Sequence, residues 1–325
     1  MPGKSSFYPF LLFLLLAIFG FVGSLISGSV DLSWGELLRV LLGGGDEITR
    51  GLVLELRLPR ALAALGVGGL LGIAGVLMQV LLRNSLADPY VLGISGGAAC
   101  AALLAMMLGL GSVSVDVAAL MGALVSIFIV FGLSRGMGSW TPARLLLTGV
   151  VMASGWGAAI SFLLAMSPET DLRGMVFWLM GDLSNTSSPW PVLISLVIGL
   201  SISWPLGRTL NLLIRGEMHA ASLGVPVAAL RMGLFFTASL LTALAVTTAG
   251  SIGFIGLVTP HLIRLAGWSD HRLLLPASAL FGGTLLMVAD TLARTALAPR
   301  QLPVGVVTAL LGVPLFLYLL RRGKA

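Results

Sequence analysis

The chain has 325 residues, of which 57% are hydrophobic and only 10% are charged, and its mean hydropathy is +1.04. No soluble domain can bury so much apolar surface, so the composition excludes a soluble enzyme or binding protein and indicates a polytopic membrane protein. The formal charge of +6 comes from basic residues scattered at helix ends rather than gathered in one patch. We therefore expect membrane lipid as a partner and no nucleic acid.

The apolar runs are long and continuous, which favours helices over the alternating strands of a barrel. The run that follows Lys4 imitates a signal peptide, but it is about 20 residues long and exceeds the roughly 7–15 of a cleaved signal. It is therefore predicted as an uncleaved first span. We predict an all-α protein, one transmembrane domain over 1–325, with ten membrane helices at about 7–28, 61–82, 91–110, 113–133, 144–165, 190–206, 231–250, 252–266, 271–293 and 303–320.

Two of the predicted elements are irregular. The segment 171–181 is too short to cross a bilayer and is predicted as a partial helix at the outer surface. The eighth span is short and carries Pro260, so a kinked or incomplete crossing is expected there.

The distribution of basic residues predicts the orientation. With the N-terminus inside, the inner side holds 12 of the 19 lysines and arginines. These are Lys4, Arg83, Arg135, Arg144, Arg208, Arg215, Arg231, Arg264, Arg272, Arg321, Arg322 and Lys324. We expect both termini to be cytoplasmic, together with the polar segment at about 208–230.

That polar segment interrupts two long apolar runs. Glu217 to Leu223 can form about two helical turns, Gly224 lies where a helix C-cap needs a positive φ, and Pro226 can open the next helix. A short helix of small residues held outside the bilayer is suited to docking into a groove on another protein. An ordinary cytoplasmic loop is the simpler alternative, and the segment alone does not decide between them.

Ionisable groups at mid-membrane depth, which ion-coupled transporters use, are almost absent from the predicted spans. Asp290 and Arg294 are interpreted as a helix-end ion pair, and His261 as a packed, satisfied histidine rather than a proton relay. Cys100 is the only cysteine, so we expect no cysteine-cluster metal site. No phosphate-loop motif is complete, so we expect no cofactor or metal on this chain, and ATP and Mg²⁺ on a separate ATPase subunit.

Several segments resemble one family in order and over nearly the whole chain. They include Arg57-Leu-Pro-Arg60, Asn84-Ser-Leu-Ala-Asp-Pro89, Trp178-Leu-Met-Gly181, the stretch from Gly250 to Arg264, and Leu302-Pro-Val-Gly-Val-Val-Thr308. The chain resembles the permease subunit of the FecCD-type (type II) ABC importers for iron-siderophore complexes, cobalamin and haem. The resemblance implies ten helices per subunit and two identical permease subunits.

The resemblance also assigns residue roles at the outer face. It implies that Arg57, Arg60 and Arg294 receive acidic side chains from a periplasmic or lipid-anchored substrate-binding protein. Arg57 and Arg60 are three residues apart and are expected on one helix face. Local pairing with Glu55 or Asp290 is the alternative, and both can hold if a pair exchanges partners on docking.

On the inner side, the resemblance implies that the 208–230 segment contacts the ATPase and that Glu217 and Arg215 pair across that interface. The implied coupling residues are Arg215, Glu217, Ala220, Ala221, Ser222, Leu223 and Gly224. Asn84, Leu86 and Thr141 correspond to the cytoplasmic gate, although Pro142 departs from the hydroxyl-rich pattern expected there. The fifth and tenth spans and the partial helix would line the pathway, with Met152, Trp156 and Ser161 as candidates, although a membrane Met or Trp is more often simply packed.

The sequence therefore predicts a transport subunit of the bacterial inner membrane that carries out no covalent chemistry. It would form a homodimer, bind two ATPase subunits inside and receive a loaded binding protein outside. We rank iron-siderophore complexes first as the cargo, cobalamin second and haem third. An ion-coupled secondary transporter and an intramembrane enzyme are the alternatives, and each would need ionisable groups at bilayer depth.

Overall fold

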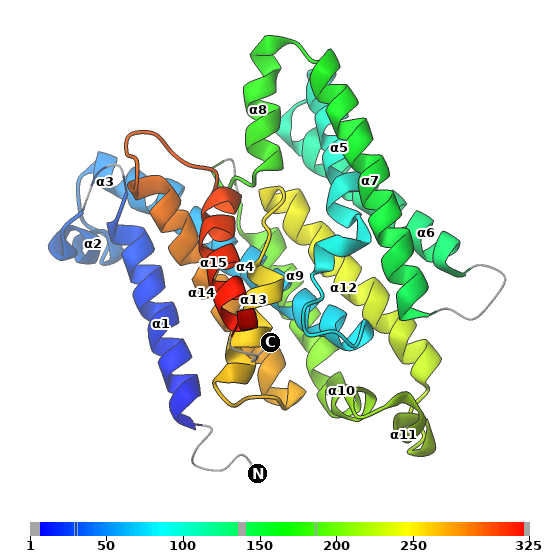
Figure 1. Ribbon diagram of the computed structural model, residues 1–325. Coiled ribbons are helices and arrows are strands. Elements are labelled where there is room, and N and C mark those ends of the chain that lie inside the picture. The colour runs from blue at the N-terminus through cyan, green and yellow to red at the C-terminus, as the bar shows by residue number, and fades with distance from the viewer. Residues whose placement is uncertain are drawn as a thin grey trace.

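A computed structural model describes residues 7–28, 30, 32–135, 141–184, 186 and 188–321. Within these residues the chain forms helices and no strand, which confirms the all-α prediction (Figure 1). The longer helices are α1 (Phe7–Ile26), α4 (Leu58–Leu81), α5 (Ile94–Met107), α6 (Ser112–Arg135), α7 (Pro142–Met166), α9 (Trp190–Ser203), α12 (Val227–Ala249), α13 (Ile255–Leu265), α14 (His271–Thr295) and α15 (Val304–Arg321).

Each of the ten predicted spans therefore coincides with a helix. Six continuous helices of the described chain are long and apolar enough to cross a membrane by length and composition, and four shorter apolar helices occupy the first, third, eighth and tenth predicted positions. The number of helices that cross remains a prediction. Of the basic residues used to predict the orientation, Lys4, Arg322 and Lys324 lie outside the described residues.

The shorter elements lie between these helices. They are α2 (Trp34–Leu41), α3 (Glu47–Gly51), a π-helical stretch (Leu52–Arg57), a 3₁₀ turn (Pro89–Leu92), α8 (Glu169–Leu179), a 3₁₀ turn (Trp204–Leu206), α10 (Gly207–Ile214) and α11 (Glu217–Ser222). Helix α8 covers most of the segment 171–181, and its predicted place at the outer surface stays a prediction. Helices α2 and α10 were not predicted, although Ser33 and Glu36 form a capping box that marks the start of α2 in the sequence.

Helix α4 is the centre of the molecule. It contacts α14, α12, α9 and α13, and all of its residues from Gly66 to Leu81 are buried. Glycines permit this packing. A Cβ atom on Gly75 would lie 1.9 Å from the carbonyl oxygen of Gly256, and one on Gly72 would lie 2.2 Å from that of Ser278. The backbones of α13 and α14 are therefore in direct contact with that of α4.

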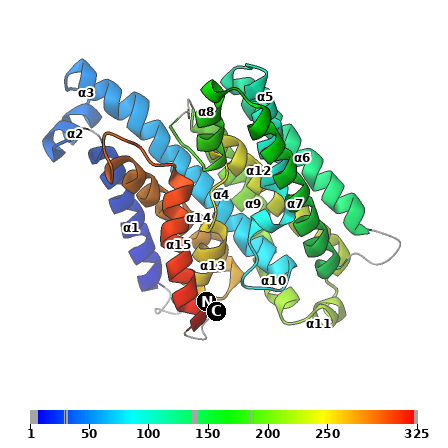
Figure 2. The same ribbon diagram turned by 45° about the horizontal axis from the view of Figure 1, so that its top comes forward.

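The two ends of the bundle carry different elements. Helices α8, α2 and α3 lie at one end, and α10 and α11 lie at the other (Figure 1). Helix α1 begins and α15 ends toward the α11 end (Figure 2). We call these the α8 end and the α11 end. The predicted outer surface corresponds to the α8 end and the predicted cytoplasmic surface to the α11 end.

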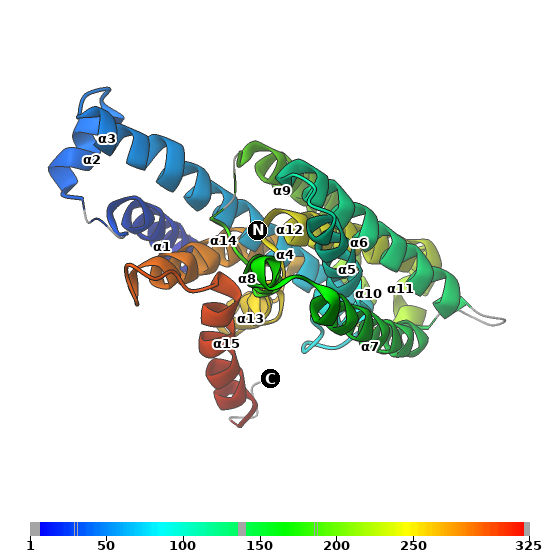
Figure 3. The ribbon, with the colours of Figure 1, turned by 90° about the horizontal axis from the view of Figure 1, so that it is seen from above.

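Helices α7, α8 and α15 lie on one side of the molecule, away from α1, α3 and α9 (Figure 3). Within this single chain, α7 is the most exposed of the six long apolar helices. Only 6% of its most apolar 18-residue stretch is buried, against 89% for the continuous helix Glu47–Leu82 that contains α4. One side of the bundle thus presents an apolar helix that the described chain leaves uncovered.

Candidate functional site

The polar segment forms the predicted short helix at the α11 end. Helix α11 covers Glu217–Ser222, and Gly224 has a φ of +82°, as a helix C-cap requires. The Val225 amide donates to the Ala220 carbonyl at 3.1 Å, which closes the end of the helix. Pro226 stands immediately before α12. The prediction of a helix followed by a glycine cap is confirmed.

The exposed face of α11 differs from the predicted one. Ala220 was expected to contact the partner, but it is fully buried because it packs beneath the helix. Ala221, Ser222, Leu223 and Gly224 are exposed. Met218 is also exposed, at 88%. Sequence reasoning missed Met218, although a lone methionine in a polar segment was the available signal.

The pairing of Glu217 and Arg215 across an ATPase interface stays a prediction, and within its own chain Glu217 already has two partners. Its carboxylate forms an ion pair with Arg231 of α12 and a second one with Arg83, at 3.3 Å between Nη1 and Oε1. Arg83 directly follows α4, so Glu217 joins three elements: α11, the start of α12 and the loop after the central helix. These ion pairs connect α11 to that loop.

The predicted gate residues are on two loops of the same end. Asn84 is exposed, and its side-chain oxygen accepts a hydrogen bond from the Leu86 amide at 2.9 Å, which fixes the turn beside Arg83. Thr141 is the N-cap of α7, with Oγ1 accepting from the Arg144 amide at 3.3 Å. Pro142 takes the first helical position, where its missing amide hydrogen costs nothing. A proline is therefore compatible with the start of α7, although it departs from the expected hydroxyl-rich pattern. The role of Thr141 and Asn84 in a cytoplasmic gate stays a prediction.

At the α8 end, Arg57 is buried rather than available to a partner. Its side chain is 3% exposed, and Nη1 donates to the carbonyls of Leu25 and Ile26 at 2.8 and 2.7 Å. It also donates to the Val30 carbonyl. The guanidinium therefore satisfies the free carbonyls at the end of α1, a structural role that sequence spacing did not reveal.

Arg60 and Arg294 share one carboxylate instead of facing outward. Arg60 forms a bidentate pair with Asp290, with Nη2 to Oδ1 at 2.9 Å, and Arg294 Nε lies 3.2 Å from Asp290 Oδ2. Asp290 is 2% exposed, Arg60 is 11% exposed and Arg294 is 8% exposed. The predicted pair of Asp290 and Arg294 is confirmed, and the alternative of local pairing with Asp290 holds for Arg60. The expected common face of Arg57 and Arg60 is wrong, since their side chains reach α1 and α14.

Helix α7 carries the predicted pathway residues on different faces. Trp156 packs against Gly96 of α5, and its Nε1 donates to Ser126 Oγ of α6 at 3.0 Å. Met152 packs against the core. Both residues therefore hold α7 to its own chain, the alternative already considered for them. Ser161 is exposed, with its hydroxyl donating to the Gly157 carbonyl at 2.9 Å.

His261 is buried, as predicted, but is not satisfied. It is 4% exposed, its ring lies edge-on to Phe316 at 6.4 Å between centroids, and Nε2 has no hydrogen-bond partner among the described residues. It lies in α13, and the described residues form no ion pair with it that would make a relay.

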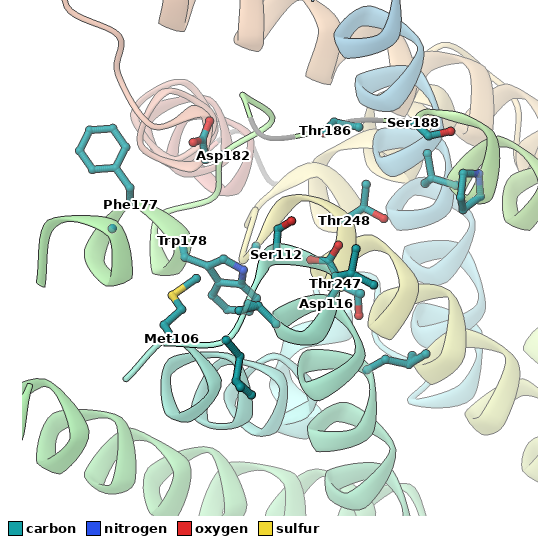
Figure 4. A pocket seen from close by; sticks show the side chains of 18 of the residues that line it. Met106, Ser112, Asp116, Phe177, Trp178, Asp182, Thr186, Ser188, Thr247 and Thr248 are labelled. Carbon is teal, nitrogen blue, oxygen red and sulfur yellow. The ribbon is translucent and has the colours of Figure 1, made fainter. Parts of the chain in front are cut away.

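A cavity opens at the α8 end, beside α8 itself. It has a volume of about 900 Å³ and lies between α8 and the ends of α6, α9 and α12. Trp178 of α8, Asp116 of α6 and Thr247 of α12 point into it (Figure 4). The lining mixes hydroxyl, carboxylate and aromatic groups, so the cavity can take a polar guest or water. None of its residues was predicted as a site residue except through the segment 171–181.

Comparisons with known proteins agree with this architecture. The family model of the FecCD transport family matches residues 15–322. The chain is 40% identical to the Vitamin B12 import system permease protein BtuC of Vibrio vulnificus, over 92% of this chain and 91% of that protein. It is 42% identical to the Hemin transport system permease protein HmuU of Yersinia pestis, over 97% and 95%. A solved metal-chelate type ABC transporter in an inward-facing conformation matches with a TM-score of 0.82 and 31% identity, over 96% and 97% of the two chains.

Proposed function

The chain belongs to the FecCD transport family, and we propose that it is the permease subunit through which ATP hydrolysis on a partner drives a bulky chelate across the bacterial inner membrane. Permease subunits of ABC importers work with an ATPase and a substrate-binding protein. The relatives named above are permeases for vitamin B12 and haemin. The chain is accordingly a transport subunit rather than an enzyme.

One observation carries the mechanism: the network around Glu217. The exposed helix α11 is connected by ion pairs to the gate loop at Arg83 and to α12 at Arg231. An ATPase that moves α11 would therefore move the loop that carries Asn84 and Leu86. ATP and Mg²⁺ would stay on the ATPase, and this chain would contribute only the exposed surface of Met218, Ala221, Ser222 and Leu223.

We propose that the second permease copy covers α7. This helix is apolar, and its outer face within one chain combines small residues such as Ser154, Gly157 and Ala158 with larger ones such as Leu147 and Phe162. A Cβ atom on Gly157 would meet no atom within 4 Å. Two such faces can approach closely around an axis, and α8 and α15 lie on the same side. The pathway would then run between α7, α8 and α15 of the two copies.

The binding protein is proposed to dock at the α8 end. Arg60 and Arg294 are candidates only if they exchange Asp290 for an acidic side chain of the partner, since both are engaged inside the chain. Arg57 is not a docking candidate, because its side chain stabilises the fold by donating to the carbonyls at the end of α1. A charge-swap at any of the three would disturb folding first, so a docking assay with these variants needs a thermal unfolding curve beside it.

The cargo is proposed to be a metal chelate of the iron-siderophore, cobalamin or haem type. Iron-siderophore complexes remain the first-ranked cargo from the sequence, while the relatives cited above carry vitamin B12 and haemin in their names. Thermal-shift screening of the purified binding protein against the three classes decides among them. A shift with one class and none with the other two identifies the cargo.

The ATPase contact is tested by a matched pair of methionines. Met218 at the α11 end and Met180 at the α8 end are both exposed, at 88% and 42%. We expect Met218→Asp to abolish co-purification of the ATPase, since it places an unpaired charge in the contact, and Met180→Asp to leave it intact. Equal retention of the ATPase by both variants would contradict the assignment of α11.

A further inference from the structure

A second cavity, of about 630 Å³, lies at the α11 end between the loop after α4, α10, the end of α13 and the start of α14. Three arginines line it, Arg83, Arg215 and Arg264, together with His271. It is a polar cavity, since Ile214 is the only apolar residue in its lining. Asn84 of the predicted gate and Arg215 of the predicted coupling set are also part of its lining.

Two buried nitrogens of this cavity have no hydrogen-bond partner among the described residues. One is Nη1 of Arg264, whose Nη2 already donates to Gln79 Oε1 at 2.5 Å. The other is Nε2 of His271, a side chain that is 2% exposed. A buried polar group without a partner costs about 1–3 kcal/mol, so a ligand or an ordered water that reaches either nitrogen would be stabilised there.

The hydrogen-bond network fixes the character of the histidine nitrogen. Asn211 Nδ2 donates to Asp270 Oδ1 at 2.8 Å, so the Asn211 amide oxygen faces His271. That oxygen accepts from the His271 backbone amide at 3.0 Å and lies 2.6 Å from Nδ1. Nδ1 must therefore carry the hydrogen, which leaves Nε2 of the neutral ring as an acceptor. The cavity thus offers one unsatisfied donor and one unsatisfied acceptor.

The charge of the cavity is positive. Arg215 makes no ion pair within the described residues, and Arg264 is bonded only to a neutral amide. Arg83 is matched by Glu217. The one carboxylate in the lining, Asp270, is held by Arg272 with Nη2 to Oδ2 at 2.6 Å, and these hydrogen bonds hold the pKa of Asp270 well below its usual range. Arg215 and Arg264 therefore remain without a counter-charge.

We propose that this cavity is a binding site for inorganic hydrogen phosphate. That anion carries two charges, several acceptor oxygens for Arg264 and Arg215, and one P–OH group that can donate to His271 Nε2. Sulfate, a carboxylate and a lipid phosphodiester carry no such proton at neutral pH. Phosphate is also the product that the proposed ATPase partner releases. Bound there, it would link the gate loop at Arg83 and Asn84 to α10 and α14.

The test uses the permease alone, in nanodiscs of phosphatidylcholine, so it does not depend on the ATPase. Binding of radiolabelled phosphate is measured at pH 7.5 by equilibrium dialysis, with unlabelled sulfate, acetate and arsenate as competitors. We expect saturable binding that arsenate displaces, with sulfate and acetate at least about tenfold weaker, because one hydrogen bond in a buried site is worth about that factor. Nanodiscs that contain phosphatidylglycerol should bind phosphate equally, since a diester does not compete.

Two variants and a control locate the site. Arg215→Gln changes an exposed side chain and should weaken phosphate binding by about tenfold, and His271→Phe should remove the preference for phosphate over sulfate. Arg208 lies on α10 but outside the cavity lining, so the Arg208→Gln variant should bind phosphate as tightly as the native protein does. No saturable phosphate binding, equal binding of sulfate, or an equal loss in Arg208→Gln would each overturn the proposal. If His271→Phe does not fold, Arg215→Gln and the sulfate comparison still decide it.

Discussion

Helices α4 and α7 are both long and apolar, yet α4 is buried by the rest of the chain and α7 is exposed. The apolar stretch that contains α4 has a mean hydropathy of 2.2 and is 89% buried, whereas that of α7 has a value of 1.7 and is 6% buried. Hydropathy alone therefore does not distinguish a core helix from a peripheral one. The two helices differ in what their glycines contact. Gly75 of α4 faces the Gly256 backbone, and Gly157 of α7 faces nothing in its own chain.

One permease chain therefore has a half whose helices are enclosed by the rest of the chain, which we call the closed half. In the other half, which we call the unfinished half, the chain leaves the helices exposed. The closed half comprises α4 with α13 and α14, and it includes the ion pairs that join Arg60 of α4 to Asp290 of α14. The unfinished half comprises α7 with α8 and α15, where we propose that a second copy completes the protein. Stability should depend mostly on the first half and transport on the second.

The largest loss is expected from breaking the buried ion pairs of the closed half. Asp290→Ala leaves Arg60 and Arg294 buried without their counter-charge, which should lower the free energy of unfolding by about 3–5 kcal/mol. Thermal unfolding in detergent measures the change. Glu55→Ala, an exposed acid at the same end, is the control and should stay within about 0.5 kcal/mol. A small effect of Asp290→Ala would mean that the pairs do not hold α4 to α14.

The next largest effect should come from adding a single methyl group to α4. Gly75→Ala places Cβ against the Gly256 carbonyl, so the backbones must separate, at a cost of about 1–3 kcal/mol. Gly157→Ala adds the same group to α7 and should not lower the unfolding temperature. Equal unfolding temperatures for the two variants would contradict the distinction between the halves.

A pH-dependent effect of intermediate size is expected at Asp88, in the loop after α4. Burial raises the pKa of Asp88 from 3.8 to about 6. The folded state therefore favours the protonated carboxyl, and stability from this group falls as the pH rises from about 4 to about 6. Asp88→Asn, which keeps the cap on the Tyr90 amide, should raise stability by about 1–2 kcal/mol at pH 7.5 and by roughly half as much at pH 5.

Asp270 is the opposite case and serves as the control for Asp88. Hydrogen bonds from Arg272 lower the pKa of Asp270, so its contribution to stability is present above its unfolded-state pKa and is lost only as the pH falls through the lower folded-state value. Asp270→Asn should therefore lower the unfolding temperature at both pH 5 and pH 7.5. A stabilising Asp270→Asn, or an Asp88→Asn effect that does not depend on pH, would contradict this assignment.

The smallest effect on stability is expected on α7, where the readout is instead the second copy. In a Cys100→Ala background, Ser154→Cys should give a cross-linked dimer with a short bifunctional thiol reagent in native membranes. Val197 lies on α9 and is 65% exposed, and the Val197→Cys variant should remain monomeric. Monomers from both variants would exclude α7 from the interface.

The sequence predicts helices better than it predicts side-chain directions. Apolar length was sufficient to place a helix on every predicted span, and Gly224 and the short α11 followed from local cap chemistry. Arg57 was misassigned because its partners, the carbonyls at the end of α1, are about 30 residues distant in sequence and carry no residue signature. Ala220 was misassigned for the same reason, since burial depends on which neighbouring helix covers a face.

The second helix also began earlier than predicted. The continuous helix starts at Glu47, through a π-helical stretch at Leu52–Arg57, rather than at 61. Charged Glu55, Arg57 and Arg60 interrupt the apolar run, and hydropathy therefore ended the span there. The exposure of Met218 and the cavity beside His271 could not be predicted from the sequence beyond single residues. Both depend on segments that only the fold brings together.

Uphill uptake into proteoliposomes tests the central claim most directly, since the membrane part is proposed to have no energy source of its own. Vesicles that contain the permease, its ATPase and the loaded binding protein should accumulate the chelate only with ATP on the ATPase side. Removing the ATPase should abolish accumulation even under an imposed proton or sodium gradient. Accumulation against a gradient by the permease without the ATPase would contradict the account.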